Sequence, residues 1–87
     1  MNSVLHTFKV QLIGKDNQPI PSAMIMINKG DHPFQDIATY TDEQGLFYLP
    51  NLIIPGNYEI KIIIDGMDSI VVQYYFDKNS KNIHFKI

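Results

Sequence analysis

Serine and histidine are the residues of this chain whose side chains serve most often in nucleophilic and acid–base catalysis. The four serines lie in predicted turns or at predicted strand ends, and none follows the G-x-S-x-G pattern that exposes a catalytic nucleophile. The histidines His6, His32 and His84 are scattered without a fixed spacing. Because the chain has no cysteine, thiol catalysis, disulfides and zinc–thiolate sites are excluded. The sequence therefore predicts a protein that is not an enzyme.

Acidic residues around one histidine form the nearest approach to a metal site. Asp31, His32 and Asp36 share one predicted loop, and Asp42 and Glu43 lie in the next turn. Oxygen ligands of this kind suit Ca²⁺, and both segments could converge at one end of the fold. The spacing does not match an EF-hand loop, and aspartates in turns commonly accept hydrogen bonds from the backbone. We therefore expect turn-forming acids, with no metal and no other cofactor.

The charge balance argues against nucleic-acid and membrane partners. Seven basic and nine acidic residues give a formal net charge of −2, and the densest basic segment is the turn Lys78–Lys81. No apolar run approaches the ~20 residues that span a bilayer. The start Met1–His6 lacks the basic and apolar regions of a secretory signal. We expect a chain that stays in the cytoplasm, is exported without a classical signal, or is a fragment of a secreted protein.

Short alternating segments, separated by turn residues, fill the chain. Period-two hydrophobicity predicts strands rather than helices. The predicted strands cover residues 5–13, 23–28, 36–41, 46–49, 57–65, 69–76 and 82–87. With 87 residues, of which 45% are hydrophobic, the chain has the size and composition of one folded domain spanning 1–87. The expected fold is all-β, a seven-stranded antiparallel Greek-key sandwich.

Alternation also separates a buried face from an outer one. The residues predicted to be buried are Phe8, Val10, Leu12, Ile25, Ile27, Phe47, Leu49, Leu52, Tyr58, Ile60, Ile62 and Phe85. Asp65–Asp68 is predicted to form the tight turn of a hairpin. Apolar residues left on the other face are Met24, Met26, Ile63, Val71 and Tyr75.

The most specific pattern runs from Thr39 to Tyr58. Asp42–Gly45 predicts a β-turn in which Gly45 takes a positive φ. Pro50 predicts the end of the short strand that follows, because proline cannot donate to a β-ladder. Pro55–Asn57 predicts a second turn that delivers Tyr58 to the next strand.

This spacing, D-E-x-G-x-F-x-L-x-x-L-x-x-P-G-x-Y, resembles the carboxypeptidase regulatory-like, or transthyretin-like, β-sandwich family. The upstream segment Gly14–Ala23 resembles the same family's G-x-P turn, and the resemblance extends from Phe8 to about Gly66. It implies a transthyretin-like sandwich in which the hydroxyl of Tyr58 bonds to backbone near the preceding turn. Such a scaffold carries many functions, so it implies little about activity.

Two related groups imply chemistry that this chain does not match. Hydroxyisourate hydrolases share the transthyretin fold and end in a Tyr-Arg-Gly-Ser tail, whereas this chain ends Asn82–Ile87 and contains no arginine. Pilin-type sandwiches cross-link a lysine to an asparagine beside an acid. Lys9 and Asn82 could stand for the pair, but the position expected for the acid is Ile62. We expect neither activity.

The outer apolar residues predict a protein-binding or connector module. Met24, Met26, Ile63, Val71 and Tyr75 would contact another protein, through a sheet face or an edge strand, or a second copy of the chain. A β-bulge that turns these side chains inward is the other interpretation. Domains that look similar decorate larger bacterial secreted and surface proteins and type VI secretion spikes, so the resemblance implies an accessory role.

Carbohydrate or small-ligand binding is the second functional class. Tyr40, Tyr48, Tyr74 and Tyr75 have flat rings of the kind that stack on sugars. Against this interpretation, tyrosine is common in strands generally and the chain has no tryptophan.

Overall fold

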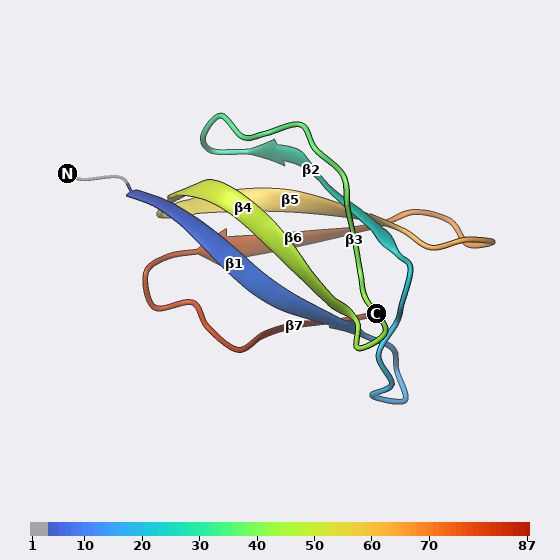
Figure 1. Ribbon diagram of the computed structural model, residues 1–87. Coiled ribbons are helices and arrows are strands. Elements are labelled where there is room, and N and C mark those ends of the chain that lie inside the picture. Colours follow the sequence, from blue (N-terminus) through green and yellow to red (C-terminus); the bar gives the residue numbers. More distant parts are fainter. Residues whose placement is uncertain (1–3) are drawn as a thin grey trace.

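Strands joined by turns and loops make up residues 4–87, the part of the chain that the computed structural model describes, and this part contains no helix (Figure 1). The strands are β1 (Val4–Ile13), β2 (Met24–Gly30), β3 (Thr39–Tyr40), β4 (Leu46–Ile54), β5 (Gly56–Ile63), β6 (Ile70–Phe76) and β7 (Ile83–Lys86). The prediction of an all-β fold is confirmed.

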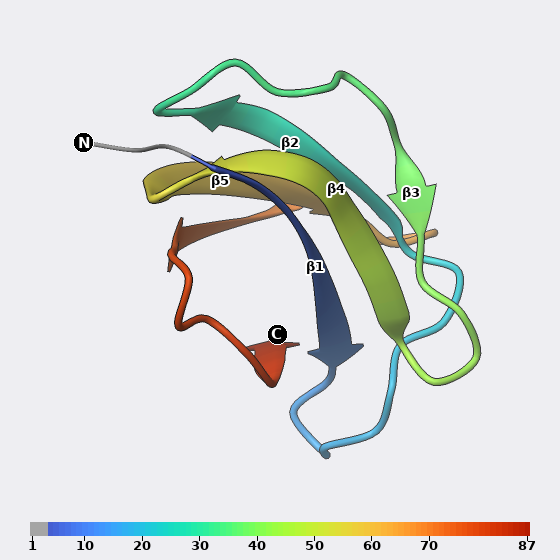
Figure 2. The same cartoon turned by 60° about the vertical axis from the view of Figure 1, so that its left-hand side comes forward.

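The strands form two sheets, which curve around a common interior (Figure 2). One has three strands in the order β4-β1-β7, and the other has four in the order β3-β2-β5-β6. Most neighbours run antiparallel, but β7 runs parallel to β1. The prediction of a purely antiparallel arrangement is therefore wrong at this pair. The connection from β6 crosses to the other sheet, so it can deliver β7 in the direction of β1.

The core lies between the two sheets. Every residue predicted to be buried is buried, and Ala23, Ile54, Phe76 and Ile83 join them. Aromatic rings connect the sheets: the Phe8 centroid lies 4.8 Å from that of Phe76, and the Tyr74 centroid lies 5.6 Å from that of Phe85. Tilted ring pairs at these separations add to the burial of apolar area. The alternation of apolar residues therefore predicted the inward-facing side chains correctly.

The turn between β3 and β4 forms as its sequence predicts. The carboxylate of Asp42 accepts hydrogen bonds from the backbone N–H groups of Gln44 and Leu46, at 2.8 and 2.9 Å. Gly45 adopts a φ of 75°, and its carbonyl accepts a bond of 2.8 Å from the N–H of Leu12. The turn therefore holds β4 to the end of β1.

Strand β4 continues past Pro50, which corrects the predicted end of this strand. Leu49 pairs with Phe8 and Leu52 pairs with His6, so Pro50 and Asn51 together lie opposite the single residue between those partners. This bulge takes up the extra residue at the point where proline has no N–H for the ladder. The strand then resumes, and Leu52 is fully buried within it.

Two other boundaries differ from the predictions. Strand β3 is two residues long, because residues 31–38 swing away from β2 as a loop before Thr39 pairs with Ile25 (Figure 2). The β5–β6 turn lies one residue earlier than predicted, since Met67 N–H donates to the carbonyl of Ile64 at 3.0 Å. Gly66 supplies the positive φ of 78° in that turn. Gly66 therefore predicted the presence of the turn correctly, but it did not determine which four residues form the turn.

Tyr58 forms the predicted corner. Its side chain is 1% exposed, and its hydroxyl donates a 2.6 Å hydrogen bond to the carbonyl of Ile53, just before the turn at Pro55. Burial raises the pKa of the Tyr58 hydroxyl, and the bond to Ile53 opposes that rise. The hydroxyl is therefore a protonated donor at neutral pH.

We expect Tyr58→Phe to lower the free energy of unfolding by about 1 kcal/mol, because the Ile53 carbonyl loses its partner while the ring stays in the core. Urea denaturation of both proteins at neutral pH measures the difference. Tyr48→Phe is the matched control, since Tyr48 is 54% exposed. An equal, negligible change for both variants would mean that the corner bond does not stabilise the fold.

Candidate protein-binding site

All five residues predicted to contact a partner lie on the outer surface of the four-stranded sheet, and four of them lie in two neighbouring rows. Met24 pairs with Ile63 on one side and with Tyr40 on the other, forming one row across the sheet. Met26 pairs with Lys61, which in turn pairs with Val71, forming the next row. We call the apolar members of these two rows the apolar face: Met24, Met26, Tyr40, Ile63 and Val71. Tyr40 was not among the predicted contacts.

Side chains of the apolar face are accessible to solvent to different degrees. Tyr40 and Val71 are 59% and 49% exposed, while Met24, Met26 and Ile63 are half-buried. The β5–β6 register runs without a shift, so no bulge turns Ile63 or Val71 inward. The alternation that placed them outside is confirmed. Their use in binding remains a prediction.

The hairpin register changes one detail of this surface. Val71 lies directly opposite Lys61, and Ile63 is its diagonal neighbour. The row that contains Val71 therefore also contains a lysine. A lysine stem is apolar and can lie along such a surface with its ammonium group in water, so the apolar area continues across the row.

Tyr75 lies apart from the apolar face. It pairs with Asn57, and the row between it and Val71 is polar, with Glu59 opposite Gln73. The Glu59 side chain is 13% exposed and accepts a 2.5 Å hydrogen bond from the amide of Asn28. That bond, more than the Lys29 ammonium 3.8 Å away, lowers the pKa of the Glu59 carboxyl. A polar band with a charged carboxylate at neutral pH thus separates Tyr75 from the other predicted contacts.

Strand β6 joins both regions and forms a free edge of the sheet. It pairs with β5, and no other strand of residues 4–87 pairs with it. Its sequence, I-V-V-Q-Y-Y-F, contains no charged residue and no proline. Natural edge strands are usually protected by charges, prolines, bulges or short length. This strand has none of these along its seven residues.

The strands at the other ends of the two sheets are protected. Strand β4 carries Pro50 and a bulge, β3 is two residues long, and β7 is four residues long and contains Lys86. The lack of protection therefore distinguishes β6 from the other end strands among residues 4–87. Sequence analysis missed this, although the absence of charge and proline between Ile70 and Phe76 was a visible signal.

The four tyrosines considered for sugar binding do not form one platform. Tyr40 and Tyr75 lie at opposite edges of the four-stranded sheet, and Tyr48 lies on β4 in the other sheet. Tyr74 packs inward, with its ring 4.7 Å from that of Phe76. No observation of the structure favours this second function.

The acids considered for a metal site are engaged with the backbone or stand apart. Asp31 accepts a 2.7 Å hydrogen bond from the N–H of Asn57, and Asp42 holds the turn described above. The ring Nε2 of His32 lies 2.8 Å from the carbonyl oxygen of Pro55. Within residues 4–87, no three side chains of the metal-binding types gather around one point. Asp36 and Glu43 are exposed, and the structure brings neither into a cluster.

Comparison with models of known protein families finds no match, and comparison with curated proteins finds no similar sequence. The transthyretin-like resemblance is therefore still a prediction that rests on the quoted residues. Residues 4–87 also contain no helix long and apolar enough to cross a membrane.

Proposed function

We propose that this protein is a non-enzymatic protein-binding module whose binding surface is the free edge of β6 together with the adjoining apolar face. The observation that carries the proposal is the unprotected edge: seven uncharged residues whose outer backbone groups have no strand beside them among residues 4–87. Unpaired N–H and C=O groups in a strand are a template for another strand. The apolar face beside it offers side-chain contacts to whatever pairs there.

The partner that fits this edge is a second copy of the chain. Two β6 strands can pair antiparallel about a two-fold axis, which is the commonest symmetry of soluble oligomers. With Gln73 on the axis, Val71 would lie opposite Tyr75 of the second copy, an aliphatic–aromatic pair of the kind that stabilises sheets. Because β6 carries no charge, no like charges meet across the axis.

The family resemblance alone suggests the wider setting of the module. In that setting it is an accessory domain of a larger bacterial secreted, surface or type VI secretion assembly. The separation of the neighbouring strands β1 and β2 into different sheets supports a Greek-key, transthyretin-like topology. In such a setting the β6 edge would connect two copies of this module.

We expect the wild-type protein to self-associate reversibly, and Val71→Lys to weaken the association at least about tenfold, because each interface would then bury two added charges. Sedimentation velocity over a series of protein concentrations measures this effect. Tyr48→Lys is the matched control: it adds the same charge at a similarly exposed position of the other sheet.

Two results would contradict the proposal. One is a wild-type protein that stays monomeric at every concentration. The other is a Val71→Lys variant that is strongly unfolded, since a surface position should tolerate lysine with a change of about 0.5 kcal/mol or less in the free energy of unfolding. Thermal melts of both lysine variants provide the second test.

A further inference from the structure

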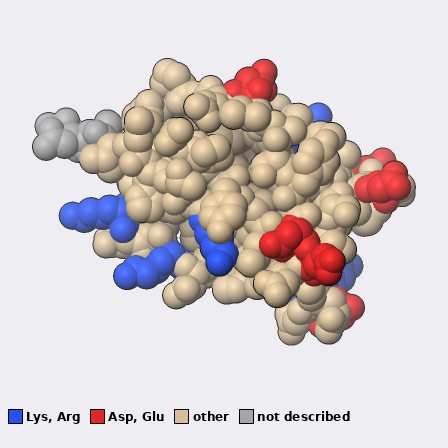
Figure 3. Space-filling model, viewed as in Figure 1, with Lys and Arg blue, Asp and Glu red and all other residues tan. Residues whose placement is uncertain are grey.

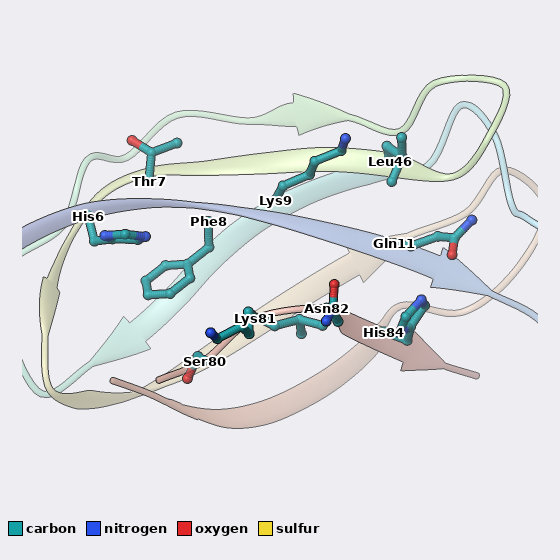
Figure 4. Close-up of a pocket in the computed structure, with 11 residues that line it drawn as sticks. His6, Thr7, Phe8, Lys9, Gln11, Leu46, Ser80, Lys81, Asn82 and His84 are labelled. Atoms are coloured by element: carbon teal, nitrogen blue, oxygen red, sulfur yellow. The ribbon is translucent and has the colours of Figure 1, made fainter. Parts of the chain in front are cut away.

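A groove of about 350 Å³ lies beside the three-stranded sheet, between β1 and the segment that leads into β7 (Figure 4). One wall is β1 from His6 to Lys9. The other wall is the segment Ser80–Asn82, which runs below β1 in this view. The groove belongs to the sheet that does not contain β6, so it is separate from the proposed association surface.

The backbone of β1 is open along this groove. Strand β4 pairs with β1 from Val4 to Gln11, whereas β7 pairs with β1 from Val10 to Ile13. Among residues 4–87, no strand therefore pairs with the first six residues of β1, Val4–Lys9, on the β7 side.

The directions of two hydrogen bonds show which backbone groups are open. Ile13 C=O accepts from Ile87 N–H, on the β7 side, while Leu12 N–H donates to Gly45 C=O, on the β4 side. Backbone groups of a strand alternate between its two sides. Thr7 and Leu5 therefore point their N–H and C=O groups into the space that β7 does not reach. A strand placed there would continue the line of β7 along β1.

Lysine and histidine side chains line the groove, and acidic side chains do not. The lining residues include Lys9, Lys81, His6 and His84, and none is an aspartate or glutamate. The chain as a whole has a formal net charge of −2, so this composition is local. Several lysine side chains lie at the left and lower left of the molecule, near β1 and the β6–β7 connection, where this view shows no acidic side chain (Figures 1 and 3). The charge of the groove is complementary to carboxylates.

We infer that this groove binds an extended, acidic peptide segment of another protein, which pairs with β1 by strand addition. The N–H and C=O groups of Leu5 and Thr7 bond to the main chain of the peptide. The ammonium group of Lys81 receives an Asp or Glu side chain of the peptide. With β6 on the other sheet, the module would then hold two partners at once.

The test uses a fluorescein-labelled hexapeptide of alternating glutamate and valine, about the length of the open stretch of β1. The protein carries Val71→Lys, so that self-association through β6 does not interfere. We expect saturable binding by fluorescence anisotropy, with amide shifts in an NMR titration concentrated at Leu5, Thr7 and Lys9. Lys81→Glu should weaken binding at least about tenfold, because it replaces an attraction by a repulsion. Lys78→Glu, in the same connection but outside the groove, should weaken it less than about twofold.

Further peptides separate strand addition from simple charge attraction. A hexapeptide of alternating lysine and valine should not bind. Two N-methylated forms of the acidic peptide keep its charge: one is methylated on the odd-numbered residues and the other on the even-numbered residues. Only the form that lacks the N–H groups facing β1 should lose binding.

The inference is overturned if the acidic peptide does not bind, if Lys81→Glu and Lys78→Glu weaken it equally, if both N-methylated peptides bind as well as the parent, or if the shifts fall on β6. None of these results would affect the sedimentation test of β6 association. Conversely, a wild-type protein that stays monomeric would leave the peptide titration unchanged.

Discussion

Replacing Phe47 by alanine is expected to lower the free energy of unfolding by ~3–5 kcal/mol. Phe47 is 1% exposed, pairs with Val10 in the centre of the three-stranded sheet, and lies 6.0 Å from the ring of Phe85. Its removal leaves a cavity in a core cluster to which both sheets contribute. Since small domains have a total stability of about 5–15 kcal/mol, the variant should be close to unfolding at room temperature.

Urea denaturation followed by circular dichroism measures this loss. Tyr48→Ala is the matched control, because Tyr48 is the next residue of β4, faces outward and is 54% exposed. We expect that control to lose about 1 kcal/mol or less. Equal losses at the two positions would mean that β4 does not present Phe47 to the core.

Gly45→Ala is expected to lower the free energy of unfolding by about 2–4 kcal/mol, for two reasons that add. The φ of 75° is a left-handed conformation that an L-residue adopts at a cost of about 1–2 kcal/mol. A methyl group at this position would also overlap the carbonyl oxygen of Leu12, so the turn would have to move away from β1. That movement would stretch the bond from Leu12 N–H to Gly45 C=O.

Gly66→Ala isolates the first reason, the conformational cost of a positive φ. Gly66 has a similar φ of 78°, but a methyl group there would meet no other atom within 4 Å. Its replacement should therefore show the conformational cost alone, about 1–2 kcal/mol. If thermal melts give the two variants the same stability, the close approach of the turn to β1 does not hold the sheet together.

Local signals in the sequence predicted the local structure well. Alternation identified the buried face of each long strand, because the side-chain period of a strand is two and does not depend on its neighbours. Asp42–Gly45 predicted its turn, because carboxylate capping and positive φ act within four residues. The Tyr58 corner also involves near neighbours, since Ile53 precedes it by five residues.

Features set by distant residues could not be predicted in this way. The parallel pairing of β7 with β1 depends on where the β6–β7 connection crosses, and no residue of β7 encodes its direction. The continuation of β4 past Pro50 depends on a bulge opposite the residue after His6. The hairpin register differed by one residue because Gly66 can occupy more than one position of a turn.

The candidate site shows the same division. Alternation placed Ile63 and Val71 outside, but the sequence did not reveal that β6 would lie at the end of its sheet. The β1 groove was also beyond prediction, since it exists because β7 begins at Ile83, opposite Val10, and that position follows from the packing of the whole sheet.

Amide hydrogen exchange of β6, measured by NMR at low and high protein concentration, tests most directly whether this edge is a binding surface. The informative amides are the alternate N–H groups of β6 that point away from β5. We expect their exchange to slow as concentration rises in the wild-type protein, but not in Val71→Lys, while the amides of β7 remain unchanged in both. Fast exchange of the outer β6 amides at every concentration, or equal slowing in Val71→Lys, would contradict the account.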